Sequence, residues 1–151
     1  MSEQATEPVL RKSVRVARAP EDAFRLYTEG MARWWPLATH SVEEEAAETV
    51  VFEPRLGGRI VERAQGGAEH HWGTVTEWDP PAGFAHTWHP GRDASSGQLV
   101  EVRFVADGDG TRVELVHTGW ENLGDQAPRL YEAYDSGWDH ILGQRFAGAA
   151  G

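Results

Sequence analysis

Cysteine is absent from the 151 residues of this sequence, and so are several other chemical features. Without cysteine there is no disulfide framework and no thiolate to act as a nucleophile or a metal ligand. No apolar run approaches the roughly 20 residues that a membrane-spanning helix needs. Residues 1–8 are polar and acidic and lack the apolar core of a secretion signal. We therefore expect a cytoplasmic protein with no membrane partner.

Positive charge is also scarce. Lysine and arginine number 14 against 24 aspartates and glutamates, which gives a formal net charge of -10. Proteins that bind nucleic acid need a basic surface to displace the counterions of the phosphate backbone. An anionic membrane surface makes the same demand. The charge balance therefore argues against nucleic acid as a partner.

Familiar catalytic and cofactor motifs are missing as well. The sequence has no GxSxG nucleophile elbow and no HExxH zinc helix. Gly57-Gly58 has no phosphate-loop context around it, and we interpret the pair as a turn between strands. Neighbouring histidines such as His70 and His71 point to opposite faces of a strand and cannot easily share an ion. We expect no catalytic motif, no metal and no cofactor.

The composition instead indicates a globular protein. Apolar residues make up 40% of the chain, and seven residues are tryptophan. A domain of this length buries about 70% of the surface that its unfolded chain exposes. We predict a flexible arm at residues 1–8 and a single domain over residues 9–151.

The N-terminal part of this domain predicts one strand followed by two short helices. Valine alternates with polar residues over residues 9–17, as in a strand with one buried face. Pro20 followed by Glu21 and Asp22 marks the start of a helix, because proline has the φ of the first turn and the acids face the positive end of the helix dipole. A second short helix is expected over residues 31–35.

Six more strand-like segments follow with no helix between them. Their connections are short and rich in glycine, proline and aspartate, as in β-hairpins. Parallel strands would need crossover helices, so the sheet should be antiparallel. The predicted strands cover residues 48–53, 59–63, 71–78, 84–89, 98–106 and 111–118.

The C-terminal part predicts one long amphipathic helix. Asp125 is expected to cap it, and Pro128 lies near its first turn. Gly137 costs a helix about 0.5–1 kcal/mol relative to alanine, so we expect it to mark a close approach to the sheet. Apolar residues recur at helical spacing. They are Tyr131, Tyr134, Trp138, Ile141, Leu142 and Phe146.

Several of these segments resemble the helix-grip superfamily of START-like and pollen-allergen-like proteins, often called SRPBCC. Within it, the chain resembles the single-domain bacterial proteins named after the activator of Hsp90 ATPase homologue. The matching segments occur in the family's order and cover nearly the whole chain. They are ARWWP (32–36), FEPRLGGR (52–59), HWGTVTEWDPP (71–81), EVRF (101–104), GTRVELVHTGW (110–120), and SGW with the IL that follows it (136–142).

The resemblance implies an α+β fold of order β-α-α-β6-α, in which a curved antiparallel sheet of about seven strands grips the C-terminal helix. It also implies a cavity between sheet and helix, which in relatives holds lipids, sterols, aromatic polyketides or other apolar molecules. The eukaryotic co-chaperone of the family carries an additional N-terminal domain, for which we expect no room in this chain. The family name is therefore poor support for chaperone activation.

Alternation along the strands predicts which residues face the helix and the cavity. The inward set combines apolar and aromatic side chains with a few polar groups, as small-molecule sites do. The predicted cavity residues are Phe84, His86, Trp88, Val102, Phe104, Leu115, His117, Tyr131, Tyr134 and Trp138. The alternative is that these side chains fill a solid core.

His86 and His117 are the most interesting polar residues of this set. A histidine in a cavity titrates near neutral pH and can serve as an acid or a base. The alternative is a buried imidazole that is hydrogen-bonded to a hydroxyl group or a backbone carbonyl.

Arg59 and Arg63 share one face of a predicted strand. They have the fork geometry to bind a carboxylate or a phosphate at the mouth of a cavity. The alternative, which we favour, is that they pair with nearby acids such as Glu53 and Glu62.

Three functions remain open. The first is the binding of a small hydrophobic or aromatic molecule without catalysis. The second is a cyclase or lyase that orients a reactive chain in the same cavity, since positioning alone lowers a barrier by about 7–11 kcal/mol. Its acid–base candidates are His86, His117, Tyr131 and Tyr134. The third is a chaperone-interacting module, suggested by the family name, and a homodimer also remains open.

Overall fold

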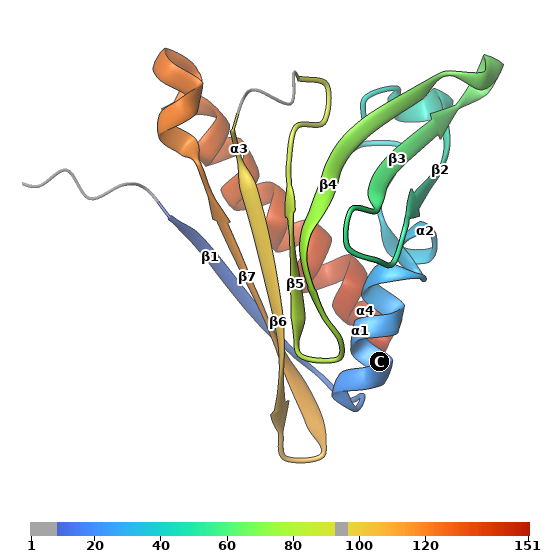
Figure 1. Cartoon of the computed structure of the whole chain (residues 1–151), viewed down its shortest axis with the longest axis vertical. Coiled ribbons are helices and arrows are strands. Elements are labelled where there is room, and N and C mark those ends of the chain that lie inside the picture. The colour runs from blue at the N-terminus through green and yellow to red at the C-terminus, as the bar shows by residue number, and fades with distance from the viewer. Residues whose placement is uncertain (1–8, 93–96) are drawn as a thin grey trace, which may run out of the picture.

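The computed structural model describes residues 9–92 and 97–151 of the chain. The arm predicted at residues 1–8 lies outside these ranges. The C-terminal helical segment crosses one face of a seven-stranded antiparallel sheet (Figure 1). The helices that follow the first strand lie beside the last turns of this segment. This arrangement confirms the predicted α+β helix-grip fold.

The sheet has the strand order β1-β7-β6-β5-β4-β3-β2, and every neighbouring pair is antiparallel. All strands from β2 to β7 therefore follow one another as hairpins, as the short turns predict, while β1 adds to the free edge of β7. The strands are β1 (Leu10–Val16), β2 (Ala47–Phe52), β3 (Arg59–Ala64), β4 (Glu69–Asp79), β5 (Gly83–Thr87), β6 (Leu99–Asp107) and β7 (Gly110–Thr118).

The sheet curves because its pairing register shifts within the β2–β3, β3–β4 and β4–β5 pairs. Such bulges insert an extra residue into one strand and bend it. Gly73 lies at a place where β4 passes close to β5, and a Cβ atom there would collide with the carbonyl oxygen of Thr87. The curvature leaves a hollow face for the helices.

Two short helices connect β1 to β2. Helix α1 (Pro20–Thr28) begins at the predicted proline, and α2 (Met31–Trp34) follows after Gly30. A side chain at Gly30 would collide with the carbonyl oxygen of Leu26, so the tight connection requires glycine. The apolar face of α1 packs against the sheet.

The C-terminal segment is mostly helical, with a kink at Gly124, but it is not the single α-helix that we predict. After a 3₁₀ segment, η4, it continues through an α-helix, a π-helical stretch and a last α-helical turn. Their bounds are η4 (Trp120–Gln126), α3 (Ala127–Trp138), η5 (Asp139–Phe146) and α4 (Ala147–Ala150). A π-helical stretch has wider turns and is often found at functional sites. No helix in the described part of the chain is long and apolar enough to cross a membrane.

Two details of this helix differ from the predictions. Asp125 is not the cap of α3, because the residue before the helix is Gln126 and no side chain makes a capping hydrogen bond. Gly137 does not approach the sheet. The nearest atoms to an added Cβ belong to the ring of His40, at 3.9 Å. Trp138, one position further around the helix, is the residue that points inward.

Aromatic rings fill the space between the sheet and α1. Phe24 of α1 lies 5.6 Å from Phe84 and 5.1 Å from Phe104, measured between ring centroids. Tyr27 lies 5.3 Å from Phe146 of η5. Rings at these distances and in tilted or edge-on orientations bury large apolar areas in close contact. We call this filled part of the interior the α1 end.

Candidate functional site: a groove beside α3

A groove opens between α3, the loop after α2 and the residues after β5. Its cavity volume is about 360 Å³, which lies within the range of small-molecule sites. Apolar and aromatic side chains form most of its lining. The lining residues are Trp35, His40, Ser41, Trp88, Pro90, Leu130, Ala133, Tyr134, Gly137 and Ile141. We call it the α3 groove.

Tryptophan rings form the inner wall of the α3 groove. The ring centroid of Trp35 lies 5.1 Å from that of Trp72, 5.8 Å from Trp88 and 6.0 Å from Trp138. The indole N–H of Trp35 donates to the carbonyl oxygen of His40 at 2.7 Å, which ties the loop after α2 to this wall. Trp35 and Trp88 line the groove and are only 5% and 2% exposed, so the groove has a closely packed and rigid aromatic wall.

Hydrogen bonds to Glu62 of β3, which is fully buried, hold the same loop in place. Its carboxylate accepts hydrogen bonds from the backbone N–H groups of Val42 at 2.7 Å and Glu43 at 2.8 Å, and from the indole of Trp72 at 3.0 Å. A buried carboxylate is tolerated only with such donors around it. Glu62 thus fixes the chain that carries His40 into the groove.

The position of Glu62 also corrects its predicted role. It is not a partner of an arginine, because its side chain points into the protein whereas the arginines of β3 point outward. Arg59 lies 3.5 Å from Glu53 as predicted, and Arg63 lies 3.3 Å from Glu69. Both pairs lie on the surface, where such pairs contribute little to stability.

The imidazoles of His86 on β5 and His117 on β7 lie behind the groove. The two strands flank β6, where both residues pair with Val100. Nδ1–H of His86 donates to the carbonyl oxygen of Thr87 at 2.8 Å, since a carbonyl only accepts. Nδ1 of His117 instead accepts from the indole N–H of Trp138 at 3.0 Å. In their neutral forms, His86 therefore keeps a lone pair on Nε2, whereas His117 carries its hydrogen on Nε2.

Burial keeps both imidazoles neutral at pH 7. It lowers the pKa of His86 to about 4, because a charged ring loses its hydration inside the protein. Burial, together with repulsion from His86 and Arg92, lowers the pKa of His117 to about 3. The two tautomers assigned above are therefore the forms that a ligand would meet.

Four N–H donors lie near the inner end of the α3 groove with no hydrogen-bond partner in the described part of the chain. They are Nε1 of Trp88, Nε of Arg92, Nε2 of Gln98 and Nε2 of His117. Arg92 donates from a terminal nitrogen to Oε1 of Gln98 at 2.6 Å, so the amide nitrogen of Gln98 is the end without a partner. We call these four groups the donor cluster.

Members of the donor cluster contact two residues of α3, Tyr134 and Trp138. The guanidinium carbon of Arg92 lies 5.9 Å from the ring centroid of Tyr134, and the ring of His117 lies 5.1 Å from it. Trp88 lies 5.6 Å from Trp138. Tyr134 is half-buried and lines the α3 groove. Its ring therefore stands between the groove and part of the donor cluster.

The predicted cavity residues fall into four groups. Trp88 and Tyr134 line the α3 groove. His86, His117 and Trp138 are buried behind it. The remaining strand residues pack in the apolar core, and Tyr131 lines a separate hollow of about 490 Å³ beside Trp120. These core residues are Phe84, Val102, Phe104 and Leu115.

Several groove residues escaped the sequence reasoning although a signal for some of them was present. Leu130, Gly137 and Ile141 share a helix face with Tyr134, at the spacing of an amphipathic helix. The inward alternation of β6 extends back to Gln98, which is 2% exposed. The loop residues of the groove have no periodic signal, because a loop places its side chains through individual contacts. They are His40, Ser41 and Pro90.

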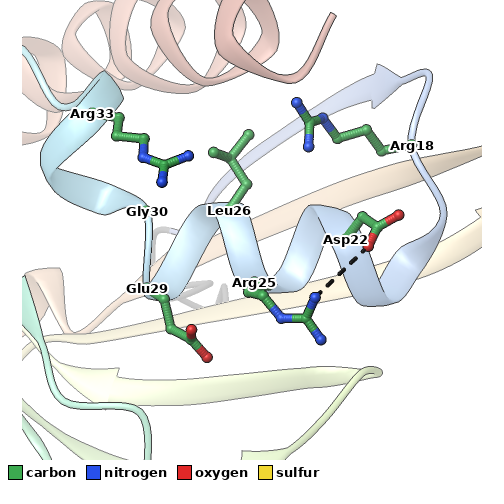
Figure 2. Close-up of a pocket in the computed structure, with 7 residues that line it drawn as sticks. All are labelled: Arg18, Asp22, Arg25, Leu26, Glu29, Gly30 and Arg33. Atoms are coloured by element: carbon green, nitrogen blue, oxygen red, sulfur yellow. Dashed lines mark ion pairs between the residues drawn. The ribbon is translucent and has the colours of Figure 1, made fainter.

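A hollow of about 300 Å³ on α1 is a weaker candidate. Figure 2 shows the side chains of Arg18 and Arg33 on either side of Leu26, with Arg25 directed away from both toward Asp22. Arg18 donates to the carbonyl oxygen of Ala150 at 2.9 Å. The lining of the hollow carries both positive and negative side chains and has no aromatic wall. We interpret this hollow as the place where Arg18, just before α1, holds the C-terminal turn.

Histidines also gather near the start of β4. Nε2 of His70 lies 2.6 Å from the carboxylate of Glu43, and the rings of His71 and His89 are 4.9 Å apart. Within residues 9–92 and 97–151, no group of three or more histidine, aspartate or glutamate side chains is placed to hold a metal ion.

A curved sheet that grips a helix, with a groove between them, defines the SRPBCC class of ligand-binding folds. The chain belongs to the family described as Activator of Hsp90 ATPase homolog 1-like protein, whose model matches residues 17–151. This match confirms the resemblance read from the sequence motifs. None of the curated proteins compared with the chain matches it.

Solved structures share the fold over nearly the whole chain. The anthrahydroquino-γ-pyrone synthase Txn09, complexed with SUM, is 37% identical, covers 93% of this chain and 96% of its own, and has a TM-score of 0.64. The self-sacrificing resistance protein CalC from Micromonospora echinospora is 29% identical, covers 95% and 94%, and has a TM-score of 0.68. The Aha1 dimer from Colwellia psychrerythraea is 15% identical, covers 89% and 90%, and at a TM-score of 0.66 shows the fold alone.

Proposed function

We propose that this chain binds a flat aromatic small molecule in the α3 groove. The observation that carries the proposal is the aromatic lining of the groove, in which Trp35, Trp88 and the half-buried Tyr134 border a volume of about 360 Å³. Stacked and edge-on contacts with such rings favour a ligand that is itself aromatic. A concave, mostly apolar site with a few polar groups is the usual form of a small-molecule site.

The similarity to Txn09 supports the same proposal. That protein is described as the synthase of an anthrahydroquino-γ-pyrone, and it is 37% identical to this chain over almost the full length of both. Such a product is a fused aromatic system that carries oxygen atoms. We infer that the ligand of the α3 groove belongs to this chemical class.

A cyclase-type enzyme is the second candidate. It is favoured by His86 and His117, which present opposite hydrogen-bonding roles behind one groove. The lowered pKa values of both imidazoles make them weak bases at pH 7, so removal of a proton is not their expected role. Nε2–H of His117 would polarise a carbonyl group, whereas the lone pair on Nε2 of His86 would orient a hydroxyl group. Replacement of His86 by phenylalanine separates the two functions, because a binding protein keeps its affinity whereas an enzyme loses turnover.

A chaperone partner rests on the family description alone. A pull-down with purified Hsp90 tests it, and retention of the chaperone by the wild-type chain would support it. Failure to retain the chaperone would leave ligand binding as the proposed function.

Binding is tested by titrating the purified protein with 9,10-anthraquinone and following tryptophan fluorescence. The matched variants are Gly137→Phe, which places a ring in the groove, and Gly137→Ala, whose added Cβ meets nothing closer than 3.9 Å. We expect saturable quenching in the wild type and in Gly137→Ala, and an affinity at least about tenfold weaker in Gly137→Phe. Equal affinities in all three proteins would show that the ligand does not occupy the α3 groove.

A further inference from the structure

We propose that the inner end of the α3 groove is a polar subsite that binds a carbonyl or phenolate oxygen of the aromatic ligand. The specificity-determining residues are Trp88, Gln98 and His117 of the donor cluster. This inference rests on the proposed function, because it names which members of the aromatic class the groove selects.

The first step is that these groups present hydrogens rather than lone pairs. Gln98 uses its oxygen to accept from Arg92, which leaves its NH₂ group as the free end. His117 uses Nδ1 to accept from Trp138, which leaves Nε2–H. An indole nitrogen such as that of Trp88 is a donor in any state. A cluster of donors alone is complementary to an acceptor oxygen and not to a hydroxyl hydrogen or a cation.

The second step is that the donors are buried without partners. Trp88 and Gln98 are each 2% exposed, and His117 is fully buried. Native proteins pair nearly all of their buried polar atoms, so several unpartnered donors in one place need an explanation. In the described part of the chain no acceptor lies within hydrogen-bond distance of these donors, and a ligand oxygen supplies what is missing.

The third step is access. Tyr134 lines the groove and also contacts both His117 and Arg92. The ring is half-buried, and rotation of such a side chain is fast compared with ligand exchange. Movement of this one ring joins the aromatic wall of the α3 groove to the donor cluster. The ligand then stacks on the tryptophans and directs its oxygen inward.

Two probes of the same outline test this subsite. In 9,10-dimethylanthracene each carbonyl oxygen of 9,10-anthraquinone is replaced by a methyl group, so the aromatic faces match and the acceptors are lost. A site built around hydrogen-bond donors rejects an analogue that leaves those donors unpaired. We expect the wild-type protein to bind the quinone at least about tenfold more tightly than the hydrocarbon.

The variant Gln98→Glu tests the role of the donors directly. It keeps an oxygen for Arg92 and replaces the donating NH₂ group by a second oxygen, which repels an acceptor. The control Gln65→Glu makes the same chemical change at an exposed turn, η2 (Gln65–Gly67). We expect the preference for the quinone to disappear in Gln98→Glu and to stay at the wild-type value in Gln65→Glu.

A spectroscopic measurement on the wild-type protein does not depend on any variant. We expect the indole N–H resonance of Trp88 to move downfield when the quinone binds, while that of Trp34, which already donates to the carbonyl oxygen of Leu26 at 3.0 Å, stays in place. An unmoved Trp88 resonance during saturable binding would count against the subsite.

The outcomes separate the subsite from the proposed function. Equal binding of both probes by the wild type overturns the polar subsite and leaves aromatic binding in the groove intact. Binding of neither probe overturns the proposed function, and the subsite with it. A quinone preference that persists in Gln98→Glu would show that other groups bind the quinone oxygen. This outcome would also overturn the inference.

Discussion

The two ends of the space between the sheet and the C-terminal helix are built from the same kinds of residue, but one end is filled and the other holds an open groove. At the α1 end, the rings of Phe24, Phe84 and Phe104 contact one another, and Trp34 donates its indole N–H to the carbonyl oxygen of Leu26. Beside α3, aromatic rings border an open groove, and the donor cluster behind them lacks acceptors in the described structure.

This difference shows what distinguishes a core from a site. Aromatic content does not, because both ends are rich in it. The polar groups do. At the α1 end, the Trp34 indole and the Thr28 hydroxyl donate to backbone carbonyl oxygens. The α3 groove instead leaves donors of Gln98 and His117 unpaired in the described structure, at a cost in free energy. A stable fold tolerates such a cost where a bound ligand supplies the missing hydrogen bonds. The unpaired atoms therefore locate the candidate site better than the rings do.

The comparison is tested most strongly by removing a ring from the filled end. Replacing Phe104 with alanine should destabilise the protein by about 3–5 kcal/mol, because it leaves a cavity among close-packed rings. Urea unfolding measures the loss. The protein that remains folded should bind 9,10-anthraquinone with wild-type affinity, and a coupled loss of affinity would mean that the two ends are not independent.

A second prediction concerns the anchor of the groove loop. Glu62→Gln replaces a carboxylate that accepts three hydrogen bonds, and we expect a loss of about 2–3 kcal/mol in the free energy of unfolding. Binding should weaken as well, because the loop carrying His40 loosens. Glu48→Gln, at an exposed position of β2, is the control and should change neither quantity.

A third prediction uses pH. His86 and His117 have folded-state pKa values of about 4 and about 3, below the ordinary value of about 6.5 that they regain on unfolding. The unfolded chain therefore binds more protons between these values, and stability falls as the pH drops below 6.5. The slope should be about 1.4 kcal/mol per pH unit for each imidazole.

Chemical unfolding at pH 7, 6 and 5 measures this slope. In His86→Phe the slope should fall by about 1.4 kcal/mol per pH unit, since the contribution of one imidazole with a strongly lowered pKa is gone. A slope that is unchanged in this variant would assign the acid sensitivity to other groups.

The smallest expected effect is at Gly137. Gly137→Ala should stabilise the protein by about 0.5–1 kcal/mol, because alanine favours the helix and its Cβ makes only van der Waals contact with the His40 ring at 3.9 Å. Thermal unfolding measures the gain. A destabilised Gly137→Ala would show that the helix and the loop at His40 lie closer together than the structure has them.

The strands and their order could be predicted because hairpin turns and alternation are local signals, and each strand of the sheet lies within two residues of its prediction. The π-helical stretch was not predictable, since residues such as Ile141 and Phe146 suit an α-helix equally well. The inner wall at Trp88 and Tyr134 could be found from alternation and helical spacing. The loop that carries His40 could not, because hydrogen bonds to Glu62, which is distant in the sequence, and to Trp35 hold it in place.

A crystal structure of the protein with 9,10-anthraquinone tests the central claim most directly. The account predicts the three fused rings in the α3 groove, stacked against Trp35 and Trp88, with one quinone oxygen within hydrogen-bond distance of the donor cluster. Quinone density in the arginine-lined hollow on α1, or a groove closed by its own side chains at saturating ligand, would contradict it.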